Sequence, residues 1–168
     1  KSLDTKIDEA KELARPAELG LIKIESSCSD CFDIDAVAEI LKESSDLEIT
    51  KEKSLSGNSQ TAREVIDKYG IKKLPTIVLT GEIEKASISS FTQVDDVLVF
   101  NAILPPYEDA ATKKIMGKVS SIIIKDDNCE VCTDFNLAIQ SLKQNGVFVD
   151  NEEEIDFSGI KAKELIDK

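Results

Sequence analysis

The sequence contains no histidine and no tryptophan, and only 7 of its 168 residues are glycine and 4 are proline. The absence of histidine excludes Ser-His-Asp and Cys-His catalytic groups, and it also excludes histidine-ligated metal sites. The low glycine and proline content excludes a collagen-like or low-complexity chain. Its apolar runs extend over only a few residues, whereas a membrane-spanning helix needs about 20. No such helix is expected within the sequence.

Basic residues are also scarce, since 21 Lys and Arg residues stand against 33 Asp and Glu residues. The formal net charge is −12 at pH 7. The surplus of acid extends over both the N-terminal and the C-terminal part, so no nucleic-acid partner and no anionic membrane surface is expected. Hydrophobic residues still make up 41% of the chain, which is enough for a packed globular core.

All 4 cysteines fall in two Cys-x-x-Cys pairs, Cys28–Cys31 and Cys129–Cys132. A short apolar run and a few polar residues precede each pair. Further along, the residues at 61–68 (TAREVIDK) match those at 161–168 (KAKELIDK). Matches of this length and order, at a shift of about 100 residues, indicate an internal repeat.

Hydrophobic periodicity predicts the elements of each copy. The first copy is expected to contain helices at 3–14, 32–42 and 61–69, strands at 19–25, 47–55, 76–79 and 83–89, and a last helix from Ser90 or Thr92 to Asn101. Gly70 is the expected C-cap of the helix at 61–69. The second copy is expected to contain strands at 119–125 and 147–149 and helices at 133–144 and 160–168.

A strand, a Cys-x-x-Cys pair before a helix, a further strand and helix, and then a proline that opens a strand together resemble the thioredoxin superfamily. Two such copies are similar to protein disulfide oxidoreductases of the tandem type. The resemblance implies an α/β thioredoxin-like fold, with a central mixed sheet flanked by helices. The complete domain would cover residues 1–104, a linker 105–117, and a partial second domain, with βαβα only, 118–168.

The resemblance also implies the roles of the cysteines. In the first copy, Cys28 would be the exposed nucleophile and Cys31 the buried resolving thiol. Cys129 and Cys132 match them in the second copy. No cofactor is expected for this chemistry.

A proline faces the cysteine pair in this family. Pro75 would be this cis-proline, and the backbone of Leu74 before it would be left unpaired, so that a substrate strand could add to that edge. The sequence departs from thioredoxin itself at several positions. The residues between the cysteines are Ser-Asp and Glu-Val rather than Gly-Pro, and Ile22 or Ile123 stands where the family places a buried acid.

The local residues bear on thiolate stability independently of the resemblance. A cysteine at a helix N-terminus meets unpaired amide groups, which stabilise the thiolate and lower the thiol pKa. Asp30 and Asp33 flank the first pair, and like charge raises a thiol pKa. We therefore expect a weakly stabilised thiolate and a site that is not strongly oxidising.

These observations favour a thiol–disulfide oxidoreductase that acts on protein dithiols and disulfides, together with an upstream redox partner. The alternative is a non-catalytic thioredoxin-like scaffold that binds a protein and whose disulfides are structural. A less favoured alternative is that the two pairs bind one metal ion as a Cys₄ site. Complete pairing of the cysteines and a start at Lys1 favour an extracytoplasmic or membrane-tethered location over a cytosolic one.

The second copy is expected to lack the strand that would follow a second cis-proline. One edge of the strand at 119–125 would then be unpaired, and such edges recruit another strand. That strand could come from a second chain, from the first copy or from residues 107–117. A homodimer is the favoured outcome.

Overall fold

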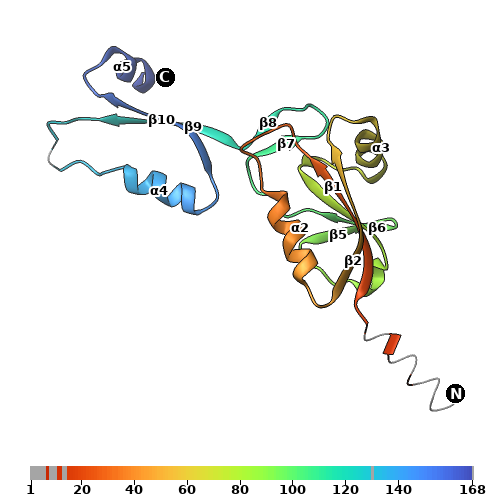
Figure 1. Ribbon diagram of the computed structural model, residues 1–168. Helices are drawn as coiled ribbons and strands as arrows, with labels where there is room; N and C mark the ends of the chain where they lie inside the picture. Colours follow the sequence, from red (N-terminus) through yellow and green to blue (C-terminus); the bar gives the residue numbers. More distant parts are fainter. Residues whose placement is uncertain (1–6, 8–10, 13–14, 130, 168) are drawn as a thin grey trace. The chain divides into compact units, whose positions relative to one another are not determined.

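The computed structural model describes residues 7, 11–12, 15–129 and 131–167 (Figure 1). The chain forms two compact units. The first extends to Ile103 and includes Tyr107–Lys114, and the second comprises Leu104–Pro106 and the chain from Ile115 onward. The stretch 105–117, expected as a linker, is thus divided between them. The helix expected at 3–14 lies largely outside the described residues.

A five-stranded mixed sheet forms the centre of the first unit, in the order β2-β1-β4-β6-β5. Its strands are β1 (Ala17–Glu25), β2 (Leu47–Ser56), β4 (Thr76–Gly81), β5 (Phe91–Val94) and β6 (Val97–Phe100). Strand β1 pairs in parallel with β2 and antiparallel with β4. Leu19, Leu21 and Ile24 of β1 are almost completely buried, and Ile22 is half-buried. The prediction of a mixed α/β chain is confirmed.

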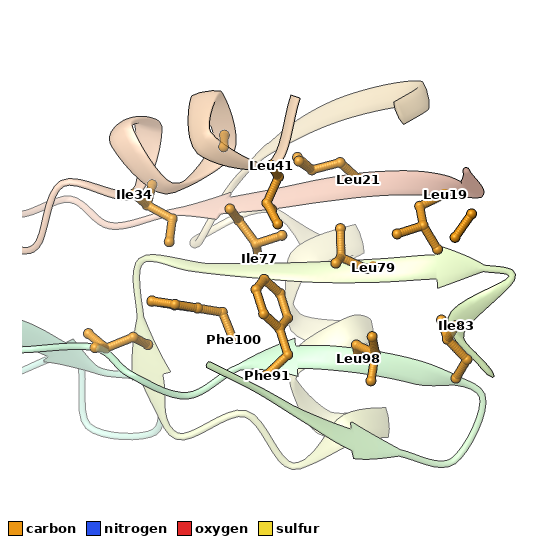
Figure 2. Packing of buried hydrophobic residues seen from close by; sticks show 13 residues of the cluster. Leu19, Leu21, Ile34, Leu41, Ile77, Leu79, Ile83, Phe91, Leu98 and Phe100 are labelled. Carbon is orange, nitrogen blue, oxygen red and sulfur yellow. The ribbon is translucent and has the colours of Figure 1, made fainter. Parts of the chain in front are cut away.

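Two helices cover the opposite faces of this sheet (Figure 1). Helix α2 (Ile34–Glu43) contributes to one apolar cluster, and Figure 2 shows Ile34 and Leu41 on the side of α2 that faces β1 and β4. Helix α3 (Gln60–Tyr69) contributes to the other cluster. Gly70 ends α3 with a φ of 62°, a left-handed conformation that favours glycine, as predicted.

The predicted helix between Ser90 and Asn101 is wrong. Strands β5 and β6 form an antiparallel hairpin there, in which Val94 is opposite Val97. The turn between them contains Asp95 at a φ of 50°, and aspartate is among the residues that tolerate this conformation. The apolar spacing around this turn is compatible with a helical period, but burial against β4 selects the hairpin because β-branched side chains pack well on a sheet.

The predicted strand at 83–89 is also wrong. The chain instead leaves β4 at Gly81, whose φ is 104°, and forms the short 3₁₀ helix η1 (Ile83–Lys85). Arg15 holds this helix to the start of β1, since its guanidinium contacts the Glu82 carboxylate at 2.6 and 2.7 Å. The pKa of Glu82 is lowered to about 2, mainly by this hydrogen bond from Arg15.

A short ladder outside the central sheet also belongs to the first unit. Strand β3 (Lys73–Leu74) pairs antiparallel with β7 (Tyr107–Asp109), and Leu74 is in register with Glu108. The amide of Ala110 donates to the Lys72 carbonyl at 2.9 Å and extends the contact. Residues that the sequence indicated as linker therefore supply a strand to the first unit. A further short strand, β8, spans Ile115–Met116.

The second unit contains β9 (Lys118–Lys125), α4 (Asn136–Gln144), β10 (Phe148–Asp156) and α5 (Ile160–Ile166). Strand β10 is longer than the predicted strand at 147–149, and it pairs in parallel with β9. The register of this pair matches that of β1 and β2. Each ladder skips one residue of its second strand, Thr50 in β2 and Asp150 in β10.

The loops after these strands correspond as well. The amide of Gly57 donates to the Glu25 carbonyl at 2.9 Å, and that of Phe157 donates to the Lys125 carbonyl at 2.7 Å. Ala62 and Ala162, in α3 and α5, are both fully buried. The corresponding positions are 100 residues apart, as in the match between 61–68 and 161–168.

The second unit differs from the first in how little it buries. Among the apolar side chains described from residue 115 to 167, only Ile123 and Ala162 are buried. Val119 and Ile122 on β9 are each 43% exposed. Within the described residues, no strand of this unit lies along the edge of β9 opposite to β10. No helix in the described ranges is long and apolar enough to cross a membrane.

The packing of α2 gives a direct test with two adjacent residues. Leu41 is 4% exposed and lies in the core cluster, whereas Ile40 is 67% exposed. We expect Leu41→Ala to lower the free energy of unfolding by about 2 to 4 kcal/mol, because it leaves a cavity. Ile40→Ala should change it by less than about 0.5 kcal/mol. Urea denaturation of the full chain measures both, and equal losses would contradict the burial of α2.

Candidate functional site

The first cysteine pair lies in the loop that joins β1 to α2. Cys28 and Cys31 form a disulfide with their Cα atoms 5.4 Å apart. Both residues are half-buried. The resemblance implied an exposed first cysteine and a buried second one, but in the oxidised pair the two have similar exposure. Exposure therefore does not distinguish the nucleophile from the resolving thiol.

The disulfide borders an open cavity of about 420 Å³. Cys28, Cys31 and Pro75 line it together with the acidic residues Glu25, Asp33 and Asp35. The peptide bond between Leu74 and Pro75 is cis. The structure thus brings the first cysteine pair and Pro75, far apart in the sequence, to one site.

Leu74 differs from its expected role. Its side chain is fully buried, and its backbone is in register with Glu108 on β7. The edge that was expected to be unpaired is therefore paired with β7. The reason is that the chain after β6 returns to this position as a short antiparallel strand.

Both cysteines precede helix α2 rather than occupy its first turn. Its N-cap is Asp33, whose carboxylate accepts from the amides of Asp35 at 3.0 Å and Ala36 at 3.2 Å. Free amide groups of this turn were expected to stabilise a thiolate. Asp33 instead satisfies two of them, and its negative charge offsets the positive end of the helix dipole.

A basic side chain also lies at this end of the sheet. The Nζ atom of Lys23 is 2.5 Å from Asp35 and 3.5 Å from Glu25. The hydrogen bond to Asp35 is the main cause that raises the pKa of Lys23. Lys23 is therefore a cation paired with carboxylates.

Sequence reasoning missed a buried acid next to the first pair. The Glu108 side chain on β7 is 2% exposed. Its Oε2 atom accepts from Ser26 Oγ at 2.8 Å and from the amide and hydroxyl of Ser27, both at 2.9 Å. Lys113 Nζ lies 3.3 Å from Oε1. No sequence pattern marks Glu108, because only the pairing of β7 with β3 brings it beside this loop.

The ionisation of Glu108 follows from these contacts. Burial is the largest influence and raises the pKa of the carboxyl. Hydrogen bonds from Ser26, Ser27 and Lys113 together outweigh it, so the net pKa is lowered. Glu108 is therefore a buried carboxylate anion at neutral pH.

The second pair is built differently. Cys129 and Cys132 form a disulfide with a Cα–Cα distance of 5.5 Å, and Cys132 is more exposed than Cys129. A local turn holds the loop, in which the Asp126 carbonyl accepts from the amide of Cys129 at 3.0 Å. The Asp126 carboxylate accepts from the amide of Asn128, also at 3.0 Å.

An open cavity of about 520 Å³ borders the second disulfide. Ile123, Phe135 and Phe157 line it beside both cysteines. No proline follows Pro106 in the sequence, so this cavity has no counterpart of Pro75.

Neither disulfide is part of a metal site in the described ranges. No group of three or more cysteine, aspartate or glutamate side chains lies close enough there to hold a metal ion. Comparison of the chain with protein-family models, curated proteins and solved structures finds no match. The functional assignment therefore depends on the geometry of the site.

The capping role of Asp33 can be separated from its charge. Asp33→Ala removes the acceptor for the amides of Asp35 and Ala36, so we expect the free energy of unfolding to fall by about 1 kcal/mol. Asp33→Asn keeps a side-chain oxygen that can cap the helix, and it should lose less than about 0.5 kcal/mol. Urea denaturation measures both changes. A loss in the asparagine variant as large as that in the alanine variant would show that charge, not capping, dominates.

Proposed function

We propose that the protein is a thiol–disulfide oxidoreductase that acts on protein dithiols and disulfides. The observation that carries the proposal is the position of the Cys28–Cys31 disulfide. Both cysteines are half-buried, and they line an open cavity together with Pro75. Exchange needs a sulfur atom that another thiol can reach, and this position provides one.

The arrangement of the first unit supports a thioredoxin-like fold as part of this proposal. Strand β1 lies between the parallel β2 and the antiparallel β4, and the cysteine pair follows β1. Pro75 immediately precedes β4. In a thioredoxin-like sheet, the first strand likewise lies between the second strand and the strand that follows the cis-proline. The hairpin of β5 and β6 stands where its last helix was expected.

The proposed reaction begins with the thiolate of Cys28 in the reduced pair. It attacks one sulfur of a substrate disulfide, forms a mixed disulfide and releases the other substrate sulfur as a thiolate. Cys31 then loses its proton and attacks the Cys28 sulfur. The second substrate thiolate leaves, and the Cys28–Cys31 disulfide forms. Two electrons have passed to the substrate, and the reverse sequence oxidises a substrate dithiol.

We propose the same chemistry for Cys129 and Cys132, supported by their disulfide and the cavity of about 520 Å³ beside it. Pairing of all 4 cysteines in disulfides supports an extracytoplasmic location, where such bonds persist. A separate redox protein would then renew the oxidised or reduced state of both pairs.

Serine variants of the first pair test the order of attack. With the second pair blocked as Cys129→Ser and Cys132→Ser, Cys28→Ser should abolish reduction of insulin by a dithiol donor. Cys31→Ser should instead accumulate a mixed disulfide with substrate, because no resolving thiol remains. Non-reducing electrophoresis and mass spectrometry detect the adduct. Equal residual activity in the two variants would contradict the assigned roles.

The alternative scaffold function predicts a different outcome in the same assay. If the disulfides are structural, neither pair will turn over, and both will resist mild dithiol reductant in the folded protein. Binding of a protein partner would then be unchanged by Cys28→Ser. This alternative is supported by two departures from the similar family. The residues between the cysteines are not the Gly-Pro of thioredoxin itself, and Ser27 and Asn128 stand where a tryptophan usually precedes the first cysteine.

We also propose that the second unit pairs with a second copy of the chain through β9. In the first unit, β4 pairs with the residues of β1 from Leu19 to Ile24. The corresponding residues of β9 have no second strand paired with them among the described strands. Val119 and Ile122 remain 43% exposed. An edge strand of this kind favours pairing with another strand.

Light scattering tests this pairing. We expect the full chain to be a dimer whose fraction rises with concentration. Ile122→Lys should give a monomer, because lysine on an edge strand opposes strand addition. Leu137→Lys, on α4 at a side chain that is 69% exposed, is the matched control and should remain a dimer. A monomeric wild type with rapid hydrogen exchange across residues 119–125 would contradict the proposal.

A further inference from the structure

A buried carboxylate, that of Glu108, is hydrogen-bonded to the loop of the first disulfide. Glu108 is 1% exposed as a residue, and all three donors to its Oε2 atom belong to Ser26 and Ser27. These are the two residues before Cys28. The family to which the sequence is similar places its buried acid in the strand before the pair, at the position of Ile22, so Glu108 reaches the loop from a different element.

A chain of hydrogen bonds connects Glu108 to Cys28. The hydroxyl of Ser26 donates to Glu108 at 2.8 Å, and its oxygen accepts from the amide of Cys28 at 3.0 Å. The Glu108 carboxylate therefore fixes the backbone conformation at Cys28 and, with it, the position of the Cys28 side chain. On its other side, Lys113 contacts Glu108 at 3.3 Å and donates to the Gly57 carbonyl at 3.1 Å.

We propose that Glu108 is a positioning residue for the Cys28–Cys31 pair and that its buried charge couples the oxidation state of the pair to the docking of β7. The coupling concerns the site of the proposed oxidoreductase function, and it deepens that function by regulating it. It requires only that the pair can be reduced in the folded protein.

The physical basis is the difference in charge between the two oxidation states. An external dithiol reduces the disulfide by transferring two electrons and two protons, and it becomes a disulfide itself. The oxidised pair is neutral, whereas reduced Cys28 can release a proton and become a thiolate. The nearby charge of Glu108 opposes that thiolate. Glu108 therefore favours the disulfide over the ionised dithiol.

Other charged groups surround the pair but differ in position. Glu25, Asp33 and Asp35 line the open cavity, where water screens their charges. Lys23 is paired with Asp35, and Lys113 contacts the Oε1 atom of Glu108, away from the three donors to Oε2. Glu25, Asp33, Asp35 and Lys23 keep their own surroundings when Glu108 alone is replaced, so their contributions cancel in a comparison with the wild type. Lys113 loses its anionic partner in Glu108→Gln, and the cation left there also favours a thiolate, so both changes act in the same direction.

Coupling of this kind acts in both directions. If Glu108 disfavours the thiolate, the thiolate must weaken the docking of Glu108 and of β7. Strand β7 is in register with Leu74, at the edge where a substrate strand was expected to bind. Reduction would thus loosen the strand that covers this edge, so substrate access depends on the oxidation state.

The second pair is an internal control. The amide of Cys129 donates to the carbonyl of Asp126 in its own loop. Among the described residues, no buried carboxylate accepts hydrogen bonds from this loop as Glu108 does from the first loop. A change at Glu108 should leave the Cys129–Cys132 equilibrium unaffected.

The first experiment compares full-length wild type, Glu108→Gln and Glu84→Gln. Glu84 is an exposed residue of η1, so its variant removes one charge away from the site. Each protein is equilibrated with reduced and oxidised dithiothreitol between about pH 6 and about pH 9, then alkylated. Peptide mass spectrometry measures the reduced fraction of each pair separately.

We expect Glu108→Gln to shift the Cys28–Cys31 equilibrium toward the dithiol by roughly three- to tenfold at the alkaline end, which corresponds to a change of up to about one unit in the thiol pKa. The shift should vanish near pH 6, where Cys28 is protonated. Glu84→Gln and the second pair should match the wild type. An unchanged equilibrium, or a shift independent of pH, would overturn the proposal, because a merely structural role would give one of these results.

A second measurement needs no variant and stands if Glu108→Gln does not fold. Hydrogen exchange at residues 107–114, including the amide of Ala110, should be faster in reduced than in oxidised wild type at about pH 9. Equal exchange rates would overturn the coupling, as would a first pair that cannot be reduced in the folded protein. Neither readout uses a protein substrate. Normal coupling without insulin reduction would therefore reject the oxidoreductase function alone.

Discussion

The structure of the first unit depends on the pairing of β1 with a strand on each side. Strand β1 pairs in parallel with β2 and antiparallel with β4, and helices α2 and α3 pack on the two faces of the sheet. Leu19, Leu21 and Ile24 of β1 are almost completely buried as a result. The same pairing places the site. The disulfide loop follows the last residues of β1. Pro75 directly precedes Thr76, the first residue of β4, which is paired with Ile24 near the end of β1. The pairing that forms the core therefore also brings the disulfide loop and Pro75 together.

The second unit shows what happens when half of that pairing is missing. Strands β9 and β10 repeat the register of β1 and β2, including one skipped residue, but β9 has no counterpart of β4 among the described residues. A small unit buries a small share of its surface, which leaves its stability marginal. The exposed apolar residues of β9 and the open cavity beside Cys129 follow from the missing strand rather than from a different local fold.

Carboxylates dominate the surroundings of the first disulfide, but they act in different ways. Asp33 satisfies the amides at the start of α2, so the helix offers little stabilisation to a thiolate. Glu108 is buried and accepts hydrogen bonds from Ser26 and Ser27 of the loop, and solvent screens a buried charge less than an exposed one. In the proposed function, both carboxylates disfavour a thiolate at Cys28 and so favour the oxidised pair.

The sequence by itself determined the local elements with strong periodicity and the location of both cysteine pairs. The strands at 19–25 and 47–55, helix α3 and its Gly70 cap are local features, because spacing and glycine conformation specify them without a partner. Tertiary structure decided the rest. Residues 91–100 became a hairpin because β4 offers an edge, and Leu74 became paired because β7 returns to it. Glu108 joined the site for the same reason, since contacts between segments distant in sequence leave no periodic signal in either segment.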